Sequence, residues 1–212
     1  DRYEEALGSL ERAVQIDPTD AEAWLWRSVA LEALKKHEEA LASFDRALEI
    51  EPDASGTLQH RGQALVNLGR YDEALGSFER AVQIEPTDAS AWFLRGVALV
   101  AMKKHEEALA SFDRGLPLLP HDPSAASVRV WVQLMKFLAQ VNLNRIEIAK
   151  HQWQEALKSA KQPQDHIAPF LMALLVLAQK DPKLARELIT ASQLEDWLFP
   201  LARALDYLLT SD

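Results

Sequence analysis

Apolar residues recur at helical spacing in the first half of the chain, in short stretches that come in pairs. One pair covers Ala21 to Leu34 and then His37 to Ile50. The apolar positions of this pair lie three, four or seven residues apart: Trp24, Leu31 and Leu34, then Ala40, Leu41, Phe44, Ala47 and Leu48. Such spacing is that of amphipathic α-helices and differs from the alternation of a strand. The pattern therefore predicts an all-α protein assembled from helical hairpins.

Prolines separate the pairs and recur at one constant interval, at Pro18, Pro52, Pro86 and Pro120. Proline cannot donate the helical hydrogen bond, so each one is expected to end a second helix before the next pair begins. Thr19 and Glu22 have the spacing of a capping box, which predicts a helix start just after the first proline. Pro117 lies inside a second helix and predicts that this helix ends one turn early.

Other positions keep the same period. An alanine recurs at Ala6, Ala40, Ala74 and Ala108, and a ring residue recurs at Tyr3, His37, Tyr71 and His105. A stronger similarity joins residues 1–52 to residues 69–120, which match at roughly three-quarters of their positions. This similarity indicates that a unit of two repeats was duplicated.

The recurring positions resemble the motif of the tetratricopeptide repeat family, in the form found in bacterial proteins. That motif asks for a large residue, a small residue and an apolar residue, then for a ring, alanine, aromatic, alanine and proline at fixed offsets. Residues 21–54 supply Trp24, Ser28, Leu31, His37, Ala40, Phe44, Ala47 and Pro52. Residues 55–88 and 89–122 repeat the pattern, with Gly62 and Gly96 as the small residues that let paired helices approach closely.

The resemblance implies a right-handed α–α superhelix, a solenoid of stacked hairpins, over residues 1–120. Asp1 to Ile16 would be a second helix with no first helix before it, so we expect a fragment, or a chain whose upstream repeats were removed, with apolar surface exposed there. Residues 121–212 are expected to be a degenerate continuation of irregular hairpins closed by a capping helix.

The degenerate part keeps a shifted copy of the repeat. The stretch from Asn144 aligns with the stretch from Gly69, at two periods plus seven residues. Seven residues are about two helical turns, so a first helix can lengthen there without rotating its apolar side. The predicted helices are Ser124 to Val141, Arg145 to Ala160, Ile167 to Gln179, Lys183 to Ala191 and the cap Glu195 to Leu209.

Composition excludes several functions. The chain has no cysteine, which excludes disulfides and thiol chemistry and suits a reducing, cytoplasmic location. A net charge of -9 repels phosphate backbones, so no nucleic-acid partner is expected. The apolar runs are too short to insert into a membrane. The six histidines have no ligand spacing, and no catalytic motif occurs, so we expect no enzyme activity, no metal and no cofactor.

The family resemblance implies that a concave face formed by the first helices binds the partner. Mapped residue by residue, this face comprises Leu25, Trp26, Val29, Gln59, His60, Gln63, Phe93, Leu94 and Val97, with Val128 and Trp131 from the degenerate part. Trp26, Phe93 and Trp131 would be apolar anchors, and the polar middle would orient the partner. Alternatively, the C-terminal helices or neighbouring helices bury this face.

One arginine per repeat forms a ladder: Arg27, Arg61, Arg95 and Arg129. Such a row could bind anions, or each arginine could pair with an acid of the second helix in its own hairpin. Asp45, Glu79 and Asp113 recur at a fixed offset and favour the structural interpretation. Gln154 replaces the acid in the degenerate part, where Glu155 would have to serve Arg129.

These features predict a non-catalytic scaffold that binds a protein partner, as a peptide or a helix, in its groove. Two alternatives remain open. The chain could be the sensor or assembly module of a larger multidomain signalling protein, or it could form a homo-oligomer through its open N-terminal helix.

Overall fold

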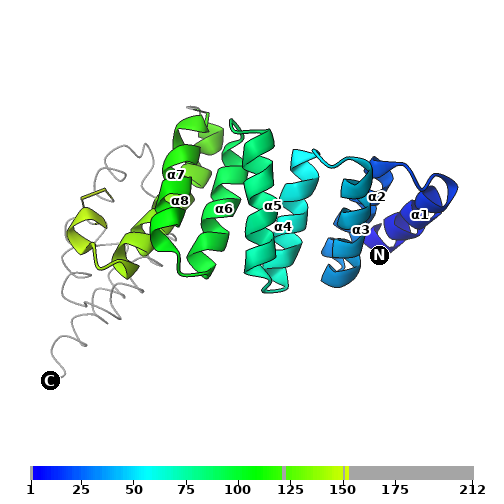
Figure 1. The fold of residues 1–212 in the computed structure, drawn as a ribbon, viewed down its shortest axis with the longest axis horizontal. Helices are drawn as coiled ribbons and strands as arrows, with labels where there is room; N and C mark the ends of the chain where they lie inside the picture. Colours follow the sequence, from blue (N-terminus) through cyan, green and yellow to red (C-terminus); the bar gives the residue numbers. More distant parts are fainter. Residues whose placement is uncertain (1, 121–122, 150, 153–212) are drawn as a thin grey trace, which may run out of the picture. The chain divides into compact units, whose positions relative to one another are not determined.

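The computed structural model of the chain describes residues 2–120, 123–149 and 151–152, and every regular element in these ranges is helical (Figure 1). The elements are α1 (Arg2–Ile16), α2 (Ala21–Ala33), α3 (His37–Ile50), α4 (Ser55–Asn67), α5 (Tyr71–Ile84), α6 (Ala89–Ala101), α7 (His105–Gly115) and α8 (Ala126–Asn142), with short 3-10 turns η1 (Leu116–Leu118) and η2 (Pro123–Ala125). The predicted all-α fold is confirmed. The chain divides into two compact units, residues 1–118 and 119–212, which are described separately.

The first unit is a row of hairpins in chain order (Figure 1). Helix α2 pairs with α3, α4 with α5 and α6 with α7, and each hairpin packs against the next through α3 with α4 and α5 with α6. The first helices also contact one another, α2 with α4 and α4 with α6, more closely than α3 approaches α5. The first helices therefore form the tighter layer of this unit.

Each hairpin turns through one residue in the left-handed region. Lys35 has φ of 60°, Gly69 of 73°, Lys103 of 61° and Asn144 of 58°. The backbone N–H of Lys36 donates to Leu31 O at 2.9 Å, and that of Lys35 donates to Glu32 O at 2.9 Å, with the same two bonds in the other three turns. This pair of bonds is the Schellman motif that ends a helix. The turn at Asn144 occupies the place of the turn at Gly69, as the sequence alignment predicted.

The start of α2 corrects the predicted capping box. Asp20 is the N-cap, and its Oδ1 accepts from the backbone N–H of Ala23 at 3.0 Å. Thr19 instead donates both its backbone N–H and its hydroxyl to Asp17 Oδ1, at 2.9 and 2.7 Å. These two bonds hold the pKa of Asp17 below its ordinary value. Thr19 is thus engaged with the preceding turn, which leaves the capping position to the next residue.

The core of the first unit is the same in each hairpin. Its fully buried residues recur with the repeat: Leu31, Leu65 and Leu99, then Ala40, Ala74 and Ala108, then Phe44, Phe78 and Phe112. A Cβ added to Gly62 would lie 2.4 Å from the ring of Phe78, and one added to Gly96 would lie 2.4 Å from the ring of Phe112. The predicted close approach at these glycines is confirmed.

The helices on either side of the boundary between the two units have nearly the bounds that the sequence predicted. Helix α7 has 11 residues where α5 has 14, and it ends before Pro117 as predicted. Helix α8 has 17 residues and nearly matches the predicted long first helix. Its partner begins at Ile146, next to the predicted Arg145, and is helical at residues 146–149 and 151–152. The predicted pair Ile167 to Gln179 and Lys183 to Ala191 and the cap Glu195 to Leu209 lie outside the described residues.

Candidate protein-binding surface

Nine of the predicted groove residues lie on the first helices of the first unit, and we call them the first-helix face. They are Leu25, Trp26 and Val29 on α2, Gln59, His60 and Gln63 on α4, and Phe93, Leu94 and Val97 on α6. Within each helix their spacing of i, i+1 and i+4 places them on one side. Positions i+3 and i+6, such as Ser28 and Leu31, are buried on the core side. Leu25 and Leu94 of the face also pack against buried core residues.

The α2 part of this face is apolar and open. The side chain of Trp26 is 52% exposed, and Leu25 and Val29 are half-buried on either side of it. The indole Nε1 of Trp26 donates to Glu22 Oε1 at 3.1 Å, which holds the ring along the helix surface. A large apolar ring held in solvent beside other apolar side chains is typical of a contact surface.

The α4 part is polar. His60 and Gln63 are exposed, and the ring of His60 stacks with that of Phe44, with centroids 6.2 Å apart. Gln59 is half-buried and its Nε2 donates to Asp88 Oδ2 at 2.6 Å. Gln59 therefore links α4 to the start of α6, and the two exposed residues are the ones left to meet a partner.

The α6 part is apolar but differs from the prediction at Phe93. Leu94 and Val97 are half-buried, whereas Phe93 is only 6% exposed and cannot be an exposed anchor. Its ring packs over Gly115, where a Cβ would lie 2.5 Å from Phe93 Cε1. The other hairpins have Ala47 or Ala81 at the position of Gly115. This missing methyl group is the sequence signal for the burial of the ring.

Two predicted residues lie in the second unit. Val128 is 41% exposed and Trp131 is 39% exposed, both on α8. They lie three residues apart, so they share a side of that helix and form a small apolar patch of the second unit. The first-helix face of the first unit does not include them.

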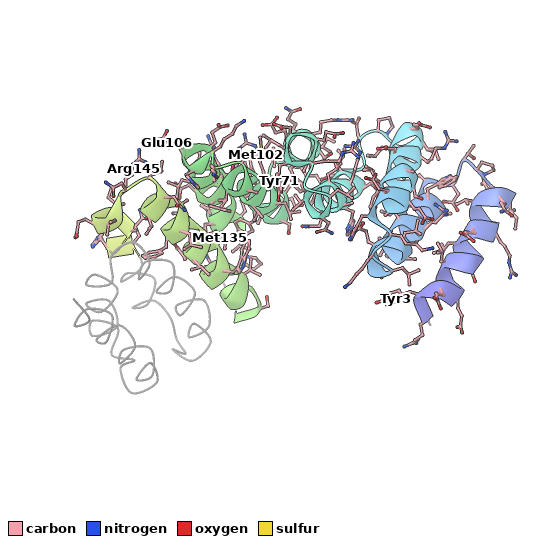
Figure 2. All side chains as sticks on the ribbon, turned by 90° about the horizontal axis from the view of Figure 1, so that it is seen from below. Tyr3, Tyr71, Met102, Glu106, Met135 and Arg145 are labelled. Carbon is pink, nitrogen blue, oxygen red and sulfur yellow. The ribbon has the colours of Figure 1, made fainter. Side chains whose placement is uncertain are left out.

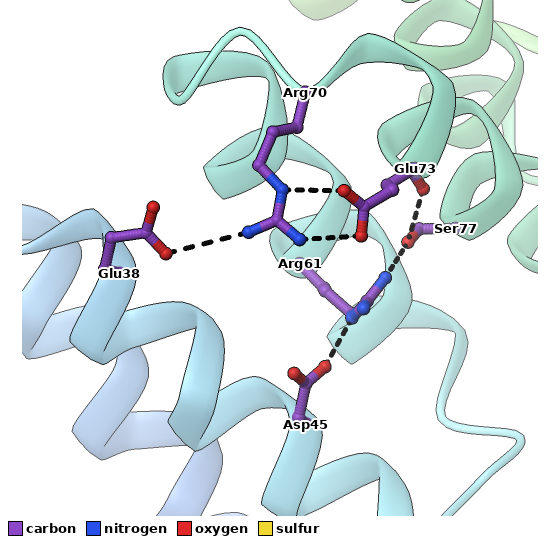
Figure 3. Close-up of polar contacts among 6 residues, drawn as sticks. All are labelled: Glu38, Asp45, Arg61, Arg70, Glu73 and Ser77. Carbon is purple, nitrogen blue, oxygen red and sulfur yellow. Dashed lines mark hydrogen bonds and ion pairs between the residues drawn. The ribbon is translucent and has the colours of Figure 1, made fainter.

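The arginine ladder of the first unit is built into the packing between hairpins (Figure 3). Arg61 Nε donates to Asp45 Oδ1 at 2.6 Å and its Nη1 donates to Ser77 Oγ at 2.8 Å. Arg95 repeats this with Glu79 Oε1 at 3.0 Å and Ser111 Oγ at 2.6 Å. The acid thus belongs to the preceding hairpin, so the predicted pairing within one hairpin is wrong.

The first arginine follows the same rule. Arg27 Nη2 lies 3.7 Å from Glu11 Oε1, and its Nη1 donates to the hydroxyl of Ser43. The serine of each hairpin was not identified from the sequence, although Ser43, Ser77 and Ser111 recur with the same period as the prolines. With an acid and a serine on each of these three guanidinium groups, the ladder is engaged internally, which favours the structural interpretation over anion binding.

Arg129 lies in the second unit and has different partners. Its Nη2 donates to the carbonyl oxygen of Pro120 at 2.8 Å and, more weakly, to that of Leu119 at 3.4 Å. The predicted counterparts Gln154 and Glu155 lie outside the described residues.

A second cluster holds the turn of the middle hairpin against α3 (Figure 3). Arg70 donates two hydrogen bonds to the carboxylate of Glu73, each 2.7 Å long, and its Nη1 lies 3.6 Å from Glu38 Oε2. The hydrogen bonds from Arg70 hold the pKa of Glu73 below its ordinary value, and they raise the pKa of Arg70. These charges satisfy one another at the turn of the middle hairpin.

Two further features bear on the chemistry of the described residues. Among residues 2–120, 123–149 and 151–152, no cluster of three or more acidic or histidine side chains is placed to hold a metal ion. In the same ranges, no helix has both the length and the apolar character needed to cross a membrane.

A comparison of the chain with models of protein families identifies its family. The model of the tetratricopeptide repeat matches residues 1–55, 61–123 and 134–196. The chain belongs to the tetratricopeptide repeat family. The resemblance stated from the sequence is confirmed, and the third match covers part of the degenerate continuation. No curated protein matches the chain.

Solved structures show the same fold. MamA of Desulfovibrio magneticus is 22% identical, with a TM-score of 0.66 over 76% of this chain and 88% of that one. YrrB, described as a tetratricopeptide repeat protein with an unusual peptide-binding site, is 21% identical, with a TM-score of 0.65 over 86% of this chain and 90% of its own. At such identities the similarity shows the fold, a solenoid of tetratricopeptide repeat hairpins.

Proposed function

We propose that this protein is an interaction scaffold that holds a peptide segment of a partner protein on its first-helix face. The family supports the general role, because tetratricopeptide repeat proteins are generally non-catalytic and bind proteins or peptides. The peptide-binding site described for YrrB is consistent with the same use of the fold. This particular face is supported by the exposure of the Trp26 side chain.

Trp26 is the observation behind the proposal, because the hydrophobic core is complete without its side chain. The core is filled by the repeating leucines, alanines and phenylalanines, and Trp26 takes no part in it. Half-buried Leu25 and Val29 extend its apolar surface on α2, and Leu94 and Val97 add a second apolar area on α6. Aromatic side chains beside apolar neighbours are the usual anchors of a protein interface.

The test is a double variant, Trp26→Ala with Leu94→Ala, measured against peptides selected from a displayed library on the intact chain. Truncating two anchors is expected to weaken binding at least about tenfold, because a hot-spot residue contributes more than about 1 kcal/mol. Ile16→Ala is the matched control, since Ile16 is an apolar side chain that is 85% exposed at the end of α1. Circular dichroism should show equal helicity in all three proteins. Unchanged binding by the double variant would rule out this face.

A second candidate, self-association, rests on the exposed side of α1. Tyr3 projects from the start of this helix and is 53% exposed (Figure 2). Ala6 is also exposed, whereas Ala40, Ala74 and Ala108 at the same position of α3, α5 and α7 are fully buried. Two copies could bury this side against each other about a two-fold axis. Light scattering over a concentration series should then show a dimer that Tyr3→Glu disrupts, and a monomer at every concentration would exclude it.

A further inference from the structure

The first-helix face has an unusual order of chemistry, apolar, polar and apolar. The apolar sets of α2 and α6 flank the polar set of α4, and none of the nine positions carries Asp, Glu, Lys or Arg. Because α2 contacts α4 and α4 contacts α6, the three sets are neighbours in this order. A segment that crosses the face therefore meets all three in turn.

The spacing of the helices limits the conformation of such a segment. Packed helices lie about 8–10 Å apart. Three residues of an extended or polyproline II chain advance about 9–10 Å, and polyproline II returns to the same side every third residue. One step from helix to helix thus corresponds to three residues of an extended partner. A helical partner would need about six or seven residues for the same step.

The middle set favours the extended form. His60 and Gln63 are exposed, and neither has a hydrogen-bond partner among the residues that the structure describes. Each side chain can both donate and accept. An extended chain leaves its own N–H and C=O groups unpaired, whereas a helix satisfies them internally. The imidazole and the amide are therefore suited to a partner segment that offers free donors and acceptors there, from its backbone and from an uncharged polar side chain.

Charge limits the composition of the partner. The nine positions of the face include no lysine or arginine that could pair with a carboxylate, and Glu22 beside Trp26 accepts from the indole. The chain as a whole carries a net charge of -9, which disfavours an acidic partner at long range.

We infer that the first-helix face selects an extended, non-acidic segment with apolar side chains six residues apart and an uncharged polar residue midway between them. One apolar side chain packs against Trp26 and Val29 and the other against Leu94 and Val97, and the polar residue faces His60 and Gln63. This inference rests on the proposed function, because it requires that a peptide binds this face.

The test exchanges the polar middle for the residues of the third hairpin. His60→Leu with Gln63→Val reproduces Leu94 and Val97 on α4 and leaves the bond from Gln59 to Asp88 in place. A random peptide library is displayed against the wild-type chain and against this variant. Gln83→Val, an exposed glutamine on α5, is the matched control. Selected peptides are then synthesised, and their affinities are measured by fluorescence anisotropy.

The wild type and the control are expected to select apolar residues at i and i+6 with a polar residue at i+3. The variant is expected to prefer an apolar residue at i+3, with a change of about tenfold in relative affinity, because a desolvated polar group would lose its partner. Selected peptides that depend on Trp26 but keep the same central preference on the variant would overturn this inference. Apolar residues spaced about 12–14 apart, the spacing for a helix across two steps, would also overturn it. If no selected peptide depends on Trp26, the proposed function itself fails.

Discussion

The middle hairpin, α4–α5, and the hairpins on either side of it share one core and differ at the starts of their first helices and on the first-helix face. Leu65, Ala74 and Phe78 are fully buried in the middle hairpin, as are their counterparts in α2–α3 and α6–α7. The starts of the hairpins are different. Asp20 and Asp88 cap α2 and α6, whereas Ala54 precedes α4 and has no side chain that can cap it.

A tryptophan marks the same difference. Trp24 Nε1 donates to Pro18 O at 3.0 Å, and Trp92 Nε1 donates to Pro86 O at 2.9 Å. Leu58 holds this position in the middle hairpin and is buried without a polar bond of that kind. The outer hairpins are thus locked to the preceding proline turn and carry the apolar parts of the face. In the middle hairpin, the carbonyl oxygen of the preceding Pro52 accepts instead from Arg80 Nη2 on α5, at 2.7 Å. This hairpin lacks the aspartate cap and the tryptophan of its neighbours, and it carries the polar part of the face.

This comparison separates two kinds of position. Those that recur in every hairpin set the fold, and those that recur only in every second hairpin adjust the helix starts and the binding face. The predictions below test that separation.

The largest effect is expected at the glycines of the shared core. Gly62→Ala and Gly96→Ala should each destabilise the protein by about 1–3 kcal/mol, because the new Cβ would overlap a buried phenylalanine ring. Gly76→Ala is the control, since a Cβ there meets nothing within 4 Å on the exposed side of α5. That change should stabilise by about 1 kcal/mol through helix propensity. Urea unfolding followed by circular dichroism measures both, and equal effects at all three glycines would contradict the account.

The helix starts come next. Ala54→Asp should give α4 the cap that α2 and α6 have, and it should raise the free energy of unfolding by about 1 kcal/mol. Asp20→Ala removes an existing cap and should lower it by a similar amount. The same urea titration tests the pair. Suppose that Asp20→Ala lowers the free energy of unfolding but Ala54→Asp does not raise it. The start of α4 would then differ from the starts of α2 and α6 in more than the missing cap.

A smaller effect is expected at the turns. Lys35 and Lys103 adopt positive φ where the middle hairpin has Gly69. Lys35→Gly and Lys103→Gly should each stabilise by about 0.5–1 kcal/mol, because a left-handed lysine is strained by more than glycine loses in chain entropy. Gly69→Lys should act in the opposite direction. Thermal unfolding resolves the sign, and destabilisation by both glycines would show that the lysine side chains stabilise these turns.

The smallest effect concerns pH. The pKa of Glu73 is lowered by its hydrogen bonds from Arg70, so its contribution to stability is present above the ordinary carboxyl pKa and is lost as the pH falls through the lowered value. Glu73→Gln should therefore reduce stability at neutral pH and leave it nearly unchanged in acid. Stability measured from pH 7 down to pH 2 tests this, and a pH-independent difference between variant and wild type would contradict it.

The sequence predicted the hairpins, their turns and the core well, because those features repeat and each copy checks the others. The insertion of seven residues was also visible, since Asn144 aligns with Gly69 and both turns have positive φ. These features depend on local backbone preference and on a single buried side of each helix.

The sequence predictions that were wrong concern which residues of neighbouring helices meet. Asp45 lies on a second helix between two arginines of the ladder, and the period alone does not say which one it meets; the structure gives Arg61, across the hairpin boundary. Phe93 has the same helical position as Leu25 and Gln59, but its burial depends on the missing Cβ of Gly115 on another helix. Such packing in three dimensions is not contained in a periodic pattern.

The most direct test of the proposed binding is an NMR titration of the isotope-labelled chain with its best selected peptide. The account predicts that the largest chemical-shift changes fall on the Trp26 indole and on the amides of α2, α4 and α6, around His60, Gln63 and Val97. Changes confined to the second helices α3, α5 and α7 would contradict it.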